Sequence, residues 1–106
     1  MEQEFFEELV ELMVVKNNNI AHGKMMSCPG VIYKKKVFCF FYGDKMVFKL
    51  GKGFDIESYG VKEYTHLNPF KNKGPMLAWY EVESKYKDKW EILADKALEN
   101  MIKEIG

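Results

Sequence analysis

Few residues in this chain of 106 carry reactive side chains, and the two cysteines are the first candidates. Cys28 and Cys39 stand eleven positions apart, which does not match the short cysteine spacing of a zinc knuckle or a redox motif. Cys39 also lies inside an apolar run, where a thiol behaves as a small hydrophobic side chain. The pattern favours structural cysteines, so we expect no metal and no cofactor, and it implies no disulfide.

The two histidines, His22 and His66, stand in segments that we predict to be loops. A catalytic triad requires a nucleophile and a carboxylate that orients the imidazole, and the sequence places neither beside them. His66 could serve as an acid or base only if the segment from Tyr64 to Pro75 formed a pocket. An enzyme acting on a small molecule is therefore a second alternative, and no residue is assigned a catalytic role.

Two other patterns could bind charged groups. The run Gly51-Lys-Gly53 superficially resembles a phosphate loop, but it lacks the spacing of a Walker or dinucleotide motif and follows a predicted hairpin. We interpret it as a turn. The carboxylates that could form an acid and base pair are predicted on solvated surfaces: Asp55, Glu57, Glu81 and Glu83.

The charges balance overall but not locally. The chain has 16 Lys, no Arg and 16 acidic residues, so its formal net charge is zero, which removes a general attraction to nucleic acid. Residues 24–53 nevertheless hold seven Lys against one Asp. Lys lacks the planar fork with which Arg reads guanine edges, and this disfavours sequence-specific reading of the major groove.

Composition predicts one domain spanning residues 1–106. Hydrophobic residues make up 47% and charged residues 30%, which is typical of a soluble protein. The longest apolar run, Val37 to Tyr42, is much shorter than the roughly 18 residues that cross a membrane. The acidic start Met-Glu-Gln-Glu does not match a signal peptide. We therefore expect a cytoplasmic protein without membrane contact.

The patterning predicts the elements that hold these residues. Apolar residues at three- and four-residue spacing predict helices over 2–16 and from Trp90 onward. Runs of β-branched and aromatic residues predict four strands: 31–33, 37–42, 45–50 and 76–82. The remaining predictions are a short helix over 54–59, a loop over 64–75 with turns at Asn68-Pro69 and Lys73-Gly74-Pro75, and Ser84 as a helix cap.

A two-residue turn at Gly43-Asp44 sets the register of the central hairpin. It creates three apolar cross-strand pairs: Phe41 with Met46, Cys39 with Phe48, and Val37 with Leu50. This face, to which Ile32 also belongs by parity, must be core. The opposite face, on which parity also places Val31, combines aromatic side chains with Lys, and we call it the aromatic/Lys face: Tyr33, Phe38, Phe40, Tyr42, Val47 and Lys49.

The aromatic/Lys face is too large an apolar patch for a monomer to leave exposed. Three explanations of how this face is covered remain possible. A helix of the same chain could pack on it, or a second copy could form a two-fold dimer over it. Alternatively, its rings could stack with the bases of single-stranded nucleic acid while Lys contacts the backbone. We expect a homodimer, with a protein partner or nucleic acid as further candidates.

Two groups of motifs occur in a recognisable order along residues 20–104. The first comprises Lys24-Met-Met-Ser-Cys-Pro-Gly-Val-Ile-Tyr33, Lys36-Val-Phe38 and Gly43-Asp-Lys-Met-Val-Phe-Lys-Leu50. The second comprises Asn68-Pro-Phe70, Gly74-Pro-Met76, Trp79, Glu81-Val82 and Trp90-Glu-Ile-Leu-Ala-Asp-Lys-Ala97. The ordered set resembles the TfoX N-terminal domain family. Ser27-Cys28-Pro29 departs from the family, in which small glycines are usual at this place.

The resemblance implies an α+β fold with helices on one side of an antiparallel sheet. We therefore expect a β-meander sheet of four or five strands with N-terminal and C-terminal helices packed on it. The resemblance also implies a non-catalytic binding or regulatory module, linked to transcription or competence regulation. The family provides no catalytic residues to transfer. A nucleic-acid-binding accessory protein that uses the aromatic/Lys face is the first alternative function.

Overall fold

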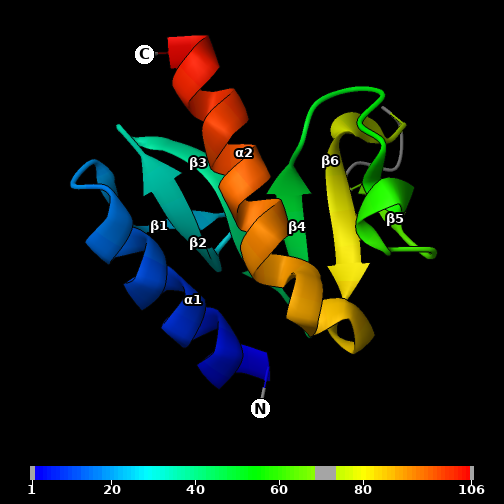
Figure 1. The fold of residues 1–106 in the computed structure, drawn as a ribbon, viewed down its shortest axis with the longest axis horizontal. Coiled ribbons are helices and arrows are strands. Elements are labelled where there is room, and N and C mark those ends of the chain that lie inside the picture. Colours follow the sequence, from blue (N-terminus) through cyan, green and yellow to red (C-terminus); the bar gives the residue numbers. More distant parts are fainter. Residues whose placement is uncertain (1, 69–73, 106) are drawn as a thin grey trace.

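A computed structural model describes residues 2–68 and 74–105 of the chain. Two long helices and a sheet form its framework (Figure 1). The elements in chain order are α1 (Glu2–Lys16), β1 (Ile20–Met25), β2 (Cys28–Tyr33), β3 (Lys36–Tyr42), β4 (Lys45–Lys49), the 3₁₀ helix η1 (Ile56–Tyr59), β5 (Thr65–Leu67), β6 (Met76–Glu83), the 3₁₀ helix η2 (Ser84–Lys89) and α2 (Trp90–Ile105).

The six strands form one antiparallel sheet in the order β1-β2-β3-β4-β6-β5. Both long helices cross the same face, which we call the helix face; the opposite face is called the far face (Figure 1). The α+β class with N-terminal and C-terminal helices on an antiparallel sheet is confirmed. Among the described residues, no helix is long and apolar enough to span a membrane.

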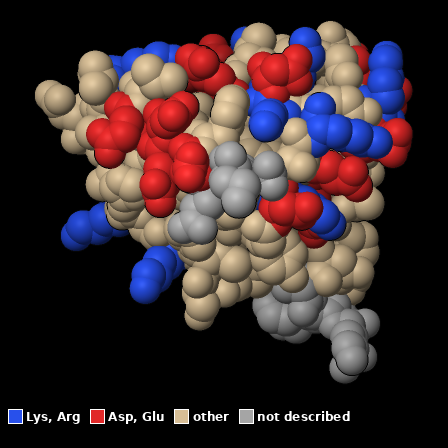
Figure 2. Space-filling model, turned by 90° about the horizontal axis from the view of Figure 1, so that it is seen from below, with Lys and Arg blue, Asp and Glu red and all other residues tan. Residues whose placement is uncertain are grey.

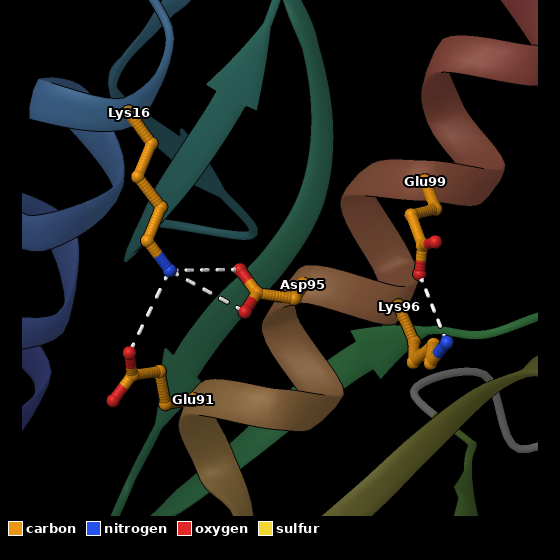
Figure 3. A network of polar contacts seen from close by, with 5 residues as sticks. All are labelled: Lys16, Glu91, Asp95, Lys96 and Glu99. Carbon is orange, nitrogen blue, oxygen red and sulfur yellow. Dashed lines mark hydrogen bonds and ion pairs between the residues drawn. The ribbon is translucent and has the colours of Figure 1, made fainter.

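Both long helices follow their apolar stripes. α1 buries four side chains against the sheet: Phe6, Leu9, Val10 and Met13. α2 buries six at the predicted spacing: Trp90, Leu93, Ala94, Ala97, Leu98 and Met101. The Nζ of Lys16, at the end of α1, lies 3.4 Å from an Asp95 carboxylate oxygen and 3.6 Å from Glu91 on α2, so an ion-pair network connects the helices (Figure 3).

The central hairpin has the predicted register for the residue pairs nearest its turn. Phe41 pairs with Met46 and Cys39 pairs with Phe48. The predicted pairing of Val37 with Leu50 is wrong. β4 ends at Lys49, and the Leu50 N–H donates instead to the C=O of Ala78 at 3.0 Å.

A β-bulge in β3 changes the faces of the neighbouring strand. Val31 of β2 lies opposite Cys39, yet Ile32 lies opposite Val37, so Phe38 is an extra residue in β3. A bulge rotates the strand, and side chains beyond it move to the other face. Val31 consequently faces the helices, whereas Val37 packs on the far face. The parity prediction for Val31, Ile32 and Val37 is therefore wrong.

Several segments predicted as loops belong to the sheet. β1 and β5 add strands at its two edges, and they contain His22 and His66. The predicted short helix is the 3₁₀ helix η1, which ends at Tyr59 and is followed by Gly60 as its C-cap with φ +91°. Ser84 opens η2 rather than capping α2. The turns predicted at Asn68-Pro69 and Lys73-Gly74-Pro75 include positions outside the described residues.

Candidate functional site

The six residues of the aromatic/Lys face do not lie together on one exposed surface. Tyr33 is 4% exposed and Phe38 is fully buried, and both belong to the core beneath the helices. The bulge is the physical cause, because it places Phe38 beside Cys39 on the helix face and turns Tyr33 toward the same core. The assignment of these two side chains to an outer binding face is wrong.

Phe40 and Val47 lie on the far face as predicted, but both are fully buried. They form a second, smaller core with Leu67 of β5 and Trp79 of β6. The ring centroids of Phe40 and Trp79 are 5.7 Å apart. Partly buried side chains surround this far-face cluster: Met25, Cys28, Val37, Met76 and Ala78. The chain itself therefore covers the centre of the predicted binding face.

Tyr42 and Lys49 remain near the surface at the two ends of the hairpin. Tyr42 is 41% exposed and its ring packs 6.3 Å from that of Phe40. Lys49 forms an ion pair with Glu104 of α2 at 3.3 Å. The two side chains project from opposite ends of the β3-β4 ladder, since Tyr42 pairs with Lys45 beside the turn and Lys49 closes β4. They do not constitute a joint site.

Cys39 and His66 are held in structural positions. Cys39 is fully buried and burial raises the pKa of its thiol well above its usual range, whereas Cys28 is half-buried. His66 packs its ring 4.7 Å from Tyr80, and its Nδ1 lies 3.3 Å from the C=O of Trp79. His22 is exposed on β1. Within the described part of the chain, no three His, Cys, Asp or Glu side chains form a group able to hold a metal ion.

A charged cleft of about 370 Å³ lies where β4, β5 and β6 meet. Glu81, whose side chain is 11% exposed, forms an ion pair with Lys45 at 3.2 Å and accepts a hydrogen bond from Thr65 Oγ1 at 3.4 Å. The remaining lining residues are Lys62, Glu63, Tyr64 and Glu83. The most buried carboxylate of the cleft is therefore already paired with side chains of two neighbouring strands.

A second groove, of about 380 Å³, lies between the end of β4 and α2. Gly51 and Lys52 line one side of it. They belong to the turn predicted at Gly51-Lys-Gly53, in which Gly51 has φ +96° and Gly53 φ +81°. The Tyr80 hydroxyl donates to the Gly51 C=O at 3.1 Å and accepts the Phe54 N–H at 3.1 Å. Burial raises the pKa of Tyr80. This hydroxyl therefore fixes the turn that follows β4.

The outer edge of β1 carries backbone groups that the sheet does not use. The two-residue turn at Met26-Ser27 makes Met25 and Cys28 a hydrogen-bonded pair. Lys34 donates its N–H to the Asn19 C=O at 3.1 Å, which sets the same alternation at the other end. Odd-numbered residues of β1 thus bond to β2, while His22 and Lys24 direct N–H and C=O away from it.

Two further observations support this alternation. Lys24 lies opposite Pro29, which has no N–H to donate across the pair. His22 and Lys24 are also exposed, and no described strand pairs with the outer side of β1. We call the outward N–H and C=O groups of His22 and Lys24 the β1 edge. The amino-acid sequence does not predict this strand, because Ile-Ala-His-Gly-Lys-Met has few β-branched residues and no Phe, Tyr or Trp.

Charge is distributed unevenly around the β1 edge. Figure 2 shows acidic side chains gathered over the α1 side of the helix layer, while lysine side chains project from the sheet layer below them. Lys24 stands on β1 itself. Lys34 and Lys35 form the turn next to the start of β1, and Lys36 follows at the start of β3. The strand edge is therefore bordered by Lys at both ends.

No family model, curated protein or solved structure matches this chain.

Proposed function

We propose that this chain is a cytoplasmic, non-catalytic binding module with a regulatory role, of the kind implied by its resemblance to the TfoX N-terminal domain. The regulation would concern transcription or competence. The observation that carries the proposal is the β1 edge, where His22 and Lys24 present unused backbone donors and acceptors. An extended segment of another protein can add to such an edge as a further strand.

The surrounding structure supports binding by strand addition. β1 is held to β2 along all six of its residues, from Ile20 opposite Tyr33 to Met25 opposite Cys28. Gly23 allows this close approach, because a Cβ at its position would collide with the side chain of Ile32. A strand fixed in this way is pre-organised, so a partner would not have to order it on binding.

A homodimer is our second proposal, and it would use a different surface from the aromatic/Lys face, whose centre is buried. Two-fold pairing of β1 with a second copy could place His22 of each chain opposite Lys24 of the other. Light scattering would then give about twice the 12.5 kDa chain mass. The nucleic-acid alternative loses its stacking platform, since Phe38 and Phe40 are fully buried.

A displayed library of random extended peptides tests the proposed function. Wild-type protein should enrich a family of sequences, and Lys24→Pro should enrich none of them. Proline at position 24 removes an outward N–H together with the lysine side chain, but it removes no bond between β1 and β2. Lys24→Ala, which loses the same charge but keeps the N–H, is the matched control. Circular dichroism and urea unfolding must show that the variant folds. Equal enrichment by both proteins, or no enrichment by either, would refute strand addition at the β1 edge.

A further inference from the structure

We infer that the partner of the β1 edge is an acidic extended segment of another protein, with carboxylates at alternate positions. This inference rests on the proposed function and specifies the chemistry of the partner. It follows from which side chains of β1 an incoming strand would meet on each face of the sheet.

On the helix face, the side chains of β1 itself that an incoming strand meets are basic or ionisable. Side chains alternate along β1, with Ile20 in the core beneath the helices and Met25 on the far face. His22 and Lys24 therefore share the face of Ile20, and both are exposed beyond the cover of α1. Cross-strand pairs of opposite charge are favourable, whereas like charges directly opposite are destabilising. Carboxylates on alternate residues of the partner fit these two positions.

On the far face, the incoming strand meets small and apolar groups. Ala21, Gly23 and Met25 occupy this face of β1, and Met25 packs against the far-face cluster. Ala21 is small and exposed, whereas the side chain of Ile32 already occupies the place of a Cβ at Gly23. The partner strand should therefore alternate, with acidic residues on the helix face and apolar residues such as Val on the far face.

The same charges favour an acidic segment over a second copy of the chain. Two-fold pairing would place Lys24 of one copy beside His22 of the other, at both ends of the contact. An acidic strand instead places carboxylates there. It also passes the Lys34-Lys35 turn and Lys36 at the start of β3, which lie beside the start of β1 because Lys34 bonds to Asn19. Attraction from these lysines should raise the association rate and weaken with salt.

Three synthetic peptides of one length test the chemistry: alternating Glu and Val, alternating Gln and Val, and alternating Lys and Val. Affinities are measured by fluorescence anisotropy for wild type, Lys24→Glu and Lys24→Pro. We expect the Glu peptide to bind about tenfold more tightly than the Gln peptide at low salt, and the Lys peptide not to bind. Lys24→Glu should reverse the preference between the Glu and Lys peptides.

The outcomes separate this inference from the proposed function. Equal binding of the Glu and Gln peptides would overturn the acidic partner while leaving strand addition in place. Enrichment of non-acidic sequences from the random library would have the same meaning. Displacement of the Glu peptide by single-stranded oligonucleotide, with unchanged binding to Lys24→Pro, would overturn it in favour of a polyanion site. If no peptide binds, both proposals fail.

Discussion

Because Phe40 is buried on the far face of the sheet, we can predict how much stability its removal costs. Its ring is fully buried, lies 5.7 Å from Trp79 and 6.3 Å from Tyr42, and belongs to the far-face cluster. Removing a buried phenylalanine ring costs about 3–5 kcal/mol through lost burial and the cavity that remains. Phe40→Ala should therefore lose much of the roughly 5–15 kcal/mol that stabilises a typical domain.

Tyr42, two residues further along β3, provides the matched control. Its ring also packs against Phe40 but is 41% exposed, so Tyr42→Ala should cost only about 1 kcal/mol. Urea unfolding followed by circular dichroism compares the two variants. With a slope of about 1–3 kcal/mol per molar urea, Phe40→Ala should unfold at least about 0.7 M below Tyr42→Ala.

A charged substitution at the same position tests the burial of Phe40 independently. Phe40→Lys would bury an unpaired ammonium group, so we expect no folded protein. A folded Phe40→Lys protein, or an alanine variant no less stable than Tyr42→Ala, would show that this face is accessible. The interpretation of the far-face cluster as a second core would then be refuted.

Three further predictions concern other parts of the chain. Lys35 has φ +74°, so Lys35→Gly should stabilise the fold by about 0.5–1 kcal/mol. Lys36→Gly in β3 removes the same charge but should destabilise the fold. Thermal unfolding of the two variants tests this difference. Burial raises the pKa of Cys39, so the folded state holds the thiol proton more tightly than the unfolded state does. The free energy of unfolding should therefore fall above pH 9.0, the ordinary pKa of a thiol. When the native protein is alkylated, mass spectrometry should find Cys28 modified first. Lys16→Met should cost less than about 1 kcal/mol, with no difference in unfolding at high salt, because the network is exposed.

The sequence predicts those parts of the fold in which local pattern and packing agree. The stripe of α2 coincides with its buried side chains, and the turn at Gly43 sets the pairing of Phe41 with Met46. The bulge at Phe38 could not be predicted, because one extra residue leaves no mark on an apolar run yet exchanges the faces of Val31 and Ile32.

The candidate site depended on contacts between distant segments. From the sequence alone, Phe40 and Val47 fit an exposed surface on which bases could stack. Only their contact with Leu67 and Trp79, which are distant in sequence, buries them in a core. Conversely, the β1 edge depends on backbone groups of His22 rather than on side-chain chemistry. A strand that pairs on one side only is recognised from topology, which a short segment of weak β propensity does not reveal.

The order of the strands also determines when the chain can complete its fold. β1 to β4 are joined by two-residue turns, so this meander can form from local contacts. β6 must reach β4 across the whole segment between Leu50 and Met76, and α2 arrives after it. During synthesis the meander leaves the ribosome before α2 can cover it. The nascent chain therefore exposes Phe48, on the strand that α2 contacts, until the last helix is released, whereas Phe41 can already stack on Phe6 of α1. This interval is when the chain most needs protection from aggregation.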